Sequence, residues 1–159
     1  MQRTARRADA VDAFHLASRA LVGVAARSLA GEDDVTLPQW RACVVLSTRP
    51  GLTVGDLAAI LDVHPSTATR LCDRLVRKRL VLRRPDRADR RTIRLELAAA
   101  GNRLVERVTE RRRLALAEIV DRIPAPDLAA ATEALRRFAA AAREQEGVDP
   151  FGWDPRVMS

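Results

Sequence analysis

Apolar side chains recur every three or four residues along much of this chain, which is the spacing that one face of an α-helix requires. Val11, Phe14 and Val24 follow this spacing in the N-terminal part. Gly31 then interrupts the pattern, as glycine commonly does after a helix. The pattern predicts a first amphipathic helix over about Asp9–Leu29.

Two shorter helices are predicted from the residues at their ends. Pro38 suits the first turn of a helix over PQWRACVVLSTR, residues 38–49, and the Pro50-Gly51 pair ends it. Thr53 and Asp56, three residues apart, resemble a capping box in which Asp replaces the usual Glu or Gln. A helix of about two turns should therefore follow Thr53.

The next helix has two chemically different faces. It is predicted over PSTATRLCDRLVRKR, residues 65–79, after a turn at 62–64. At about 100° per residue, apolar side chains gather on one side, at Ala68, Leu71, Cys72 and Leu75. Hydroxyl, carboxylate and guanidinium groups lie opposite, at Ser66, Thr69, Arg70, Asp73, Arg74 and Arg77. One face is suited to packing and the other to a polar partner.

Two β-prone runs come next, Leu80–Arg83 and Thr92–Leu97, and the residues between them are rich in arginine. Pro85, Asp86 and Ala88 are expected to turn the chain, which predicts a β-hairpin. The remaining pattern predicts helices over Ala99–Arg122 and Asp127–Glu144, separated by the sequence PAP. An irregular tail, GVDPFGWDPRVMS, follows.

The distribution of charge indicates the class of partner. The chain of 159 residues holds 28 Lys and Arg against 21 Asp and Glu, a net charge of +7. Residues 70–94 alone hold eleven Lys and Arg against three Asp, a net charge of +8, which leaves 17 basic and 18 acidic residues elsewhere. Because the positive charge is confined to one segment, it indicates a polyanionic partner at that segment rather than a general bias toward arginine.

Several function classes lose support from motifs that the sequence lacks. It has no run of 18 apolar residues and no signal-peptide pattern, which favours a cytoplasmic protein with no membrane partner. It also has no Gly-rich phosphate loop and no nucleophile elbow, so we expect neither an enzyme nor a cofactor. No pair of Cys and His residues has metal-ligand spacing, so no metal site is expected.

For the two cysteines and His64, we prefer structural roles over functional ones. Cys43 lies between Ala42 and Val44, and Cys72 lies on the apolar face of helix 65–79, so both are expected to be buried thiols. His64 directly precedes that helix, where a capping or solvent-exposed role is favoured over a sensing role.

Helix 54–61, the turn at 62–64 and helix 65–79 together predict a helix-turn-helix, whose second helix enters the DNA major groove. The hairpin then forms the wing. The predicted fold class is mainly α with a small β-wing (α+β), a winged helix-turn-helix flanked by N- and C-terminal dimerisation helices. The residues predicted to contact DNA are Ser66, Thr67, Thr69, Arg70 and Arg74 on the helix and Arg87, Asp89, Arg90 and Arg91 on the wing.

The stretch TVGDLAAILDVHPSTATRLCDRLVRKRLVLRRPDRADRRTIRLELAAAG, residues 53–101, resembles the winged-helix core of the multiple antibiotic resistance regulator (MarR) family. In that family the wing tip carries Asp-x-Arg, matched here by Asp89-Arg90-Arg91. The resemblance implies that Arg91 enters the minor groove and that Asp89 holds the tip arginines through charge-assisted hydrogen bonds. It also implies that the outer helices form a dimer.

The sequence departs from the family pattern at two helix ends. Arg79 stands where the family usually has the Gly that ends the recognition helix, and Arg disfavours the left-handed conformation. Ala98 replaces the usual Thr three residues before Gly101, and Ala cannot cap a helix. Neither departure touches a predicted DNA contact.

Many members of the family bind small aromatic acids where the dimerisation helices meet the DNA-binding lobe. By resemblance, Phe14, His15, Trp40 and Arg41 are candidates for lining such a crevice, although Trp40 is equally compatible with the core. Peroxide-sensing relatives use a reactive Cys in the first helix supported by Tyr, and this sequence has no Cys there and no Tyr.

We therefore predict a sequence-specific transcriptional regulator, a ligand-responsive repressor that binds an inverted-repeat operator in double-stranded DNA as a homodimer. The alternative is a non-specific architectural DNA-binding protein. The predicted division is a dimerisation helix at 1–35, a DNA-binding lobe at 36–98, dimerisation helices at 99–145 and a tail at 146–159.

Overall fold

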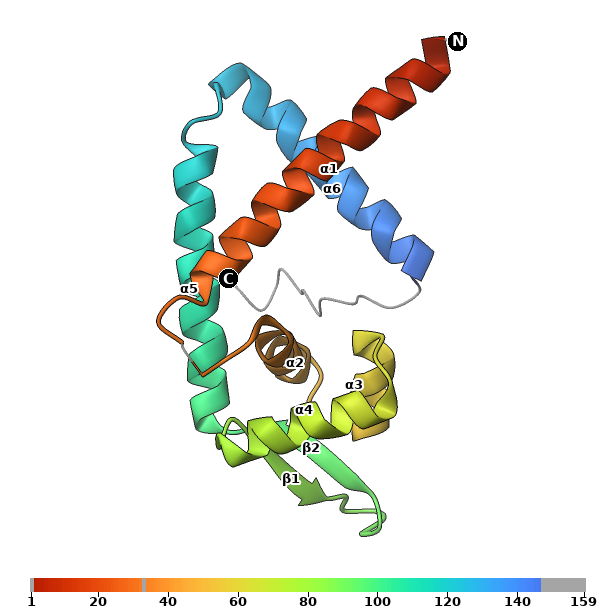
Figure 1. Ribbon diagram of the computed structural model, residues 1–159, viewed down its shortest axis with the longest axis vertical. Helices are drawn as coiled ribbons and strands as arrows, with labels where there is room; N and C mark the ends of the chain where they lie inside the picture. The colour runs from red at the N-terminus through yellow and green to blue at the C-terminus, as the bar shows by residue number, and fades with distance from the viewer. Residues whose placement is uncertain (1, 33, 147–159) are drawn as a thin grey trace.

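The computed structural model describes residues 2–32 and 34–146 (Figure 1). Helices α1 (Gln2–Ser28), α2 (Leu37–Thr48), α3 (Val54–Leu61) and α4 (Pro65–Arg77) precede a hairpin of β1 (Val81–Pro85) and β2 (Ile93–Leu97). Helices α5 (Ala99–Val120) and α6 (Ala125–Glu146) follow it. The predicted fold class, mainly α with a small β-wing, is confirmed. The predicted tail lies outside the described residues from 147 onward.

The elements form two parts that α5 connects. Helices α2, α3 and α4 and the hairpin form a compact lobe at one end of the molecule, and α1 and α6 cross at the other end (Figure 1). Helix α5 runs from the lobe to the crossing helices. Within the described residues, no helix is both long and apolar enough to cross a membrane.

The core lies between the lobe's helices, the hairpin and the first half of α5. Leu46, Leu57, Leu75, Leu95 and Leu104 are among its largest fully buried side chains, and they come from α2, α3, α4, β2 and α5 respectively. Burial of each such side chain contributes about 1.5–3 kcal/mol. Since one cluster draws on five elements, the positions of α4 and of the wing are set by the same core.

Capping boxes fix where α2 and α3 begin. The Thr53 hydroxyl accepts from the Asp56 N–H at 3.1 Å, and the Asp56 carboxylate accepts from the Thr53 N–H at 2.9 Å, so the predicted box is confirmed. Helix α2 has an equivalent box that the sequence reading missed, between Thr36 and Gln39. Together the two boxes set the boundaries of the helices that support α4.

Several predicted boundaries differ from those in the structure: α4 ends at Arg77 rather than Arg79, and α5 ends at Val120 rather than Arg122. Helix α1 begins at Gln2 rather than near Asp9, because its first residues are helix formers without an apolar stripe, and residues 4–10 are all exposed. Helix α6 begins at Ala125 rather than Asp127, since Pro126 fits a first helical turn. Pro85 was expected in the turn but is the last residue of β1, opposite Ile93. A proline is tolerated there because β1 is the edge strand of a two-stranded sheet.

Helix α4 ends in a Schellman motif centred on Arg79. The Arg79 N–H donates to the Val76 carbonyl at 2.9 Å, and the Leu80 N–H donates to the Leu75 carbonyl at 3.0 Å. Arg79 has a φ of 57°, the left-handed conformation that glycine adopts without strain. The predicted departure is therefore real: the position requires positive φ, and an arginine occupies it.

Gly101 allows α5 to approach the wing closely. A Cβ at this position would lie 2.3 Å from the carbonyl oxygen of Leu80 and 2.7 Å from a Leu97 methyl carbon. The Leu80 carbonyl also accepts from the Ala98 N–H at 3.0 Å, just where α5 begins. Ala98 makes no side-chain cap, as expected for alanine. Residue 101 is therefore a glycine because α5 lies against the Leu80 carbonyl, and not because the chain turns there.

The outer helices leave much apolar surface uncovered. Leu16 on α1 is 69% exposed, Leu114 on α5 is 57% exposed and Phe138 on α6 is 51% exposed. Phe14 stacks on Phe138 with ring centroids 4.5 Å apart, which joins α1 to α6 at their crossing. One copy of the chain therefore does not bury the apolar faces of its own long helices.

Candidate nucleic-acid interface

Helix α4 presents a polar face to solvent because its apolar face is anchored in the core. Ala68, Cys72 and Leu75 are fully buried. The residues predicted to contact DNA are all exposed on the other side: Ser66, Thr67, Thr69, Arg70 and Arg74. The amphipathic prediction for this helix is confirmed, and it leaves the first two turns accessible to a partner.

Hydrogen bonds at the start of α4 orient two of these hydroxyl groups. The His64 Nδ1 accepts from the Ser66 N–H at 3.3 Å and lies 2.8 Å from the Ser66 hydroxyl, so His64 is the N-cap, as preferred from the sequence. The Thr69 hydroxyl donates to the Pro65 carbonyl at 2.9 Å. Because its single hydrogen is used within the helix, the Thr69 oxygen is left to accept from an external N–H donor.

The wing tip is folded by two aspartates. Asp86 Oδ1 accepts from the N–H groups of Ala88, at 2.7 Å, and Asp89, at 3.2 Å. Asp89 in turn accepts from the Arg91 N–H and from the Thr92 hydroxyl, both at 3.0 Å. Asp89 therefore holds Arg91 through a charge-assisted hydrogen bond to its main-chain N–H.

The arginines predicted to meet DNA are available to a partner. Arg87, Arg90 and Arg91 on the wing and Arg70 and Arg74 on α4 are exposed. In the part of the chain that the structure describes, none of the five forms an ion pair. Their positive charge is thus not neutralised within the molecule.

Two further arginines connect the wing to α4 and to the loop between α2 and α3, a role that was not predicted from the sequence. The Arg83 guanidinium on β1 donates to Asp73 on α4 at 2.7 Å. The Arg94 guanidinium on β2 binds Asp86 at the turn and donates to the Gly51 carbonyl at 2.7 Å. The hydrogen bond from Arg94 lowers the pKa of Asp86 to about 2, with help from the N–H groups of Ala88 and Asp89.

The residues proposed for a ligand crevice lie in different environments. Trp40 is 8% exposed and belongs to the core cluster, whereas Phe14 is half-buried against Phe138 on α6. His15 is exposed on α1, and Arg41 is half-buried on α2. Phe14 and His15 lie on α1 and Trp40 and Arg41 lie on α2, and the crevice stays a prediction.

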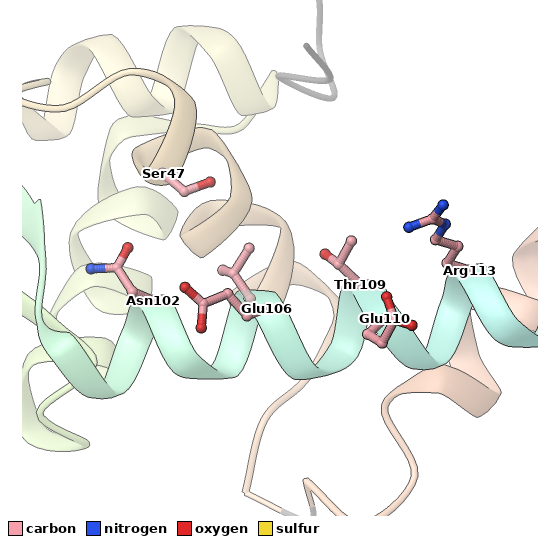
Figure 2. Close-up of a pocket in the computed structure, with 7 residues that line it drawn as sticks. Ser47, Asn102, Glu106, Thr109, Glu110 and Arg113 are labelled. Atoms are coloured by element: carbon pink, nitrogen blue, oxygen red, sulfur yellow. The ribbon is translucent and has the colours of Figure 1, made fainter. Parts of the chain in front are cut away.

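An open hollow of about 470 Å³ lies instead between α2 and α5. Figure 2 shows Ser47 on α2 facing Asn102 and Glu106 on α5, with Thr109, Glu110 and Arg113 farther along the same helix. The hollow is lined by none of the four predicted crevice residues.

Both cysteines are core residues, as predicted. Cys43 and Cys72 are fully buried and unpaired. Burial raises the pKa of Cys43 to about 12 and also raises the pKa of Cys72, so both thiols are protonated at neutral pH. No group of three or more His, Cys, Asp or Glu within the described ranges is placed to hold a metal ion.

Known proteins share this arrangement. The chain matches the MarR family model over residues 33–92. It is 30% identical over 115 residues to the HTH-type transcriptional repressor MdtR of Bacillus subtilis (strain 168). The aligned region covers 72% of this chain and 74% of MdtR. The structure of RV1404 from Mycobacterium tuberculosis has 36% identity and a TM-score of 0.77, covering 82% of this chain and 90% of that one.

A MarR family protein from Bacillus stearothermophilus is also similar in structure, with 27% identity and a TM-score of 0.78. The match covers 89% of this chain and 97% of that protein, so the outer helices are included as well as the winged lobe. Sequence and structure agree over most of the chain, and the chain belongs to the MarR family of transcriptional regulators.

Proposed function

We propose that this regulator is a homodimeric repressor that binds an inverted-repeat operator and releases it when a small ligand binds. One observation carries the proposal. Helix α4 and the wing lie at the same end of the molecule, away from the crossing of α1 and α6 (Figure 1), and the polar face of α4 and the wing residues Arg87, Arg90 and Arg91 are exposed. A helix of this kind fits the major groove, while the wing reaches the neighbouring minor groove.

The outer helices support the homodimer. Val11, Leu16 and Val22 on α1 and Leu135 and Phe138 on α6 are between 48% and 69% exposed. A second copy of the chain, related by a two-fold axis, would cover the exposed faces of both helices, because each contact in such an interface occurs twice. We assign 1–35 and 99–145 to dimerisation and 36–98 to DNA binding, with the first half of α5 shared, because Leu104 and Val108 pack in the lobe's core.

A two-fold dimer explains both the operator and the release. Its two α4 helices would lie about one turn of DNA apart, which matches an inverted repeat. A ligand that favours a different spacing of the lobes weakens DNA binding by population shift. The junction of the lobe with the outer helices is the region where a ligand would exert this effect, and Phe14, His15, Trp40 and Arg41 are the proposed contacts.

The alternative is a non-specific architectural DNA-binding protein, and selection of bound sequences from random DNA separates the two. We expect the selected sequences to converge on one inverted repeat, with a footprint confined to it. Binding that protects all sequences equally would contradict a sequence-specific repressor. Variants at Thr69 and Arg70, such as Thr69→Val and Arg70→Ala, should relax the selected sequence if α4 reads bases, at about 1–3 kcal/mol per lost contact.

A further inference from the structure

Arg94 lies at the centre of a bridge between the wing and the loop that joins α2 to α3. Its Nε binds Asp86 Oδ2, and its Nη1 donates to the Gly51 carbonyl at 2.7 Å, 43 residues away in sequence. The Asp86 side chain is only 13% exposed, so the contact is shielded from solvent on the carboxylate side. Gly51 has a φ of 82° and belongs to the loop between α2 and α3.

The bridge continues through Asp86 into the wing tip. The second oxygen of Asp86 accepts from the Ala88 and Asp89 N–H groups, which closes the turn. Asp89 then accepts from the Arg91 N–H. An unbroken series of hydrogen bonds therefore leads from the α2–α3 loop, through Arg94 and Asp86, to the main chain of Arg91.

Backbone hydrogen bonds reinforce this connection. The Leu95 N–H donates to the Leu52 carbonyl at 2.7 Å, and the Gly51 N–H donates to the Leu95 carbonyl at 3.1 Å. These bonds hold the middle of β2. In the turn itself, the Asp86 N–H donates to the Thr92 carbonyl at 2.8 Å and the Thr92 N–H donates to the Asp89 carbonyl at 2.9 Å. The side chains of Asp86 and Asp89 add four hydrogen bonds to these two.

We infer that Arg94 is a positioning residue for DNA recognition: it braces the wing turn against the α2–α3 loop and so sets where Arg91 meets the minor groove. Arg94 is not proposed to contact DNA. The inference rests on the proposed DNA-binding function, and it adds Arg94, Asp86 and Gly51 to the residues on which that function depends.

The first test examines the brace without DNA. In Arg94→Gln, amide hydrogen exchange at Ala88, Asp89 and Arg91 should become faster, because the turn loses its anchor. Arg84→Gln is the matched control: Arg84 is paired directly opposite Arg94 in the sheet and carries the same charge. Among the described residues, its one ion-pair contact is exposed, to Glu96 at 3.9 Å. Arg84→Gln should leave these amides unchanged. Equal exchange in wild type and Arg94→Gln would overturn the brace.

The second test measures operator binding across a salt series. Arg94→Gln should bind about fivefold or more weakly than wild type, as expected when one specific contact is misplaced. Its salt dependence should match that of Arg84→Gln, because neither residue releases counterions from a phosphate. In an Arg91→Ala background, Arg94→Gln should add little further loss, since the residue that it positions is already absent.

Other outcomes identify what failed. A loss in Arg94→Gln that adds fully to Arg91→Ala, with a salt slope lower by about one, would make Arg94 a phosphate contact and overturn its positioning role. Arg94→Lys keeps the charge but not the forked geometry, so it should fall between wild type and Arg94→Gln and guards against simple misfolding. If wild type selects no DNA sequence, the proposed function fails, while the exchange measurement still decides the brace.

Discussion

At the scale of single residues, the backbone at the end of α4 is the clearest source of strain. Arg79 has positive φ in a motif where both main-chain hydrogen bonds are formed, so the conformation is imposed by the helix end and not by the arginine side chain. A non-glycine residue pays about 1–2 kcal/mol for this conformation, whereas glycine loses about 0.5–1 kcal/mol through greater freedom when unfolded.

Arg79→Gly should therefore stabilise the protein slightly, by about 0.5–1 kcal/mol. Urea or thermal unfolding measures the difference. Arg77→Gly is the matched control, since Arg77 is an exposed arginine in the last turn of the same helix, where glycine is unfavourable. If both variants lose stability equally, the left-handed conformation at Arg79 carries no strain.

At the scale of elements, ion pairs join the loop that follows α1 to α5. Glu32 accepts from Arg107 at 3.1 Å and from Arg111 at 2.9 Å, and Arg111 also donates to the Ala30 carbonyl at 2.8 Å. The Glu32 side chain is 13% exposed. These contacts fix the direction in which α1 leaves the lobe.

The contact predicts an acid-dependent stability. The hydrogen bond from Arg107 lowers the pKa of Glu32 below its ordinary value of 4.5, and Arg111 acts in the same direction. Because the folded-state pKa is lowered, the stabilisation is complete above about pH 4.5 and is lost as the pH falls through the folded-state value. Wild type should thus melt above Glu32→Gln near neutral pH, and this difference should shrink in acid. Glu133→Gln, which removes an exposed pair with Arg137, should show little difference at either pH.

The wing carries the next prediction at this scale. Arg91→Ala should weaken operator binding by about 1–3 kcal/mol and leave the dimer intact, because the side chain is exposed and no core contact is lost. Arg87→Ala should cost less and mainly flatten the salt dependence, as for a phosphate neighbour. Binding by Arg91→Ala that equals wild type across a salt series would show that the wing does not reach the minor groove.

At the scale of the whole molecule, the exposed faces of α1 and α6 determine the state of assembly. Replacing Leu135 and Phe138 together with Asp should give monomer or aggregate in sedimentation, because two charges then occupy the apolar surface that a second copy would cover. The loss of Phe138 also removes the stack on Phe14. Arg137→Asp, on a different side of α6, should remain a dimer. A dimeric double variant would place the interface elsewhere.

Ligand response belongs to the same scale because it couples two sites. A phenolic acid such as salicylate should change the emission of Trp40 and lower operator affinity over one concentration range. Trp40 is a core residue, and a Trp153→Phe background removes the second tryptophan signal. Without linkage between the two measurements across a panel of phenolic acids, the protein would act as a constitutive DNA binder.

Local patterns in the sequence predicted most of the helices and the exposed polar face of α4. The Thr53–Asp56 box, the two faces of α4 and the burial of Cys43 and Cys72 follow from spacings of three or four residues, which a helix converts directly into contact or burial. The first turns of α1 were not predicted, because they have no apolar stripe.

The roles of Arg83 and Arg94 in the wing were decided by the tertiary structure alone. Arg84 and Arg94 are alike in sequence, yet only Arg94 meets the Gly51 carbonyl. The contact between Glu32 and Arg107 likewise depends on the fold, because the two residues are 75 positions apart in sequence. Such contacts arise only after the core has placed distant segments side by side, and nothing in the periodicity of either segment specifies its partner. The sequence by itself therefore determined which residues are exposed and charged, and the fold decided which of them are held within the protein and which remain available to DNA.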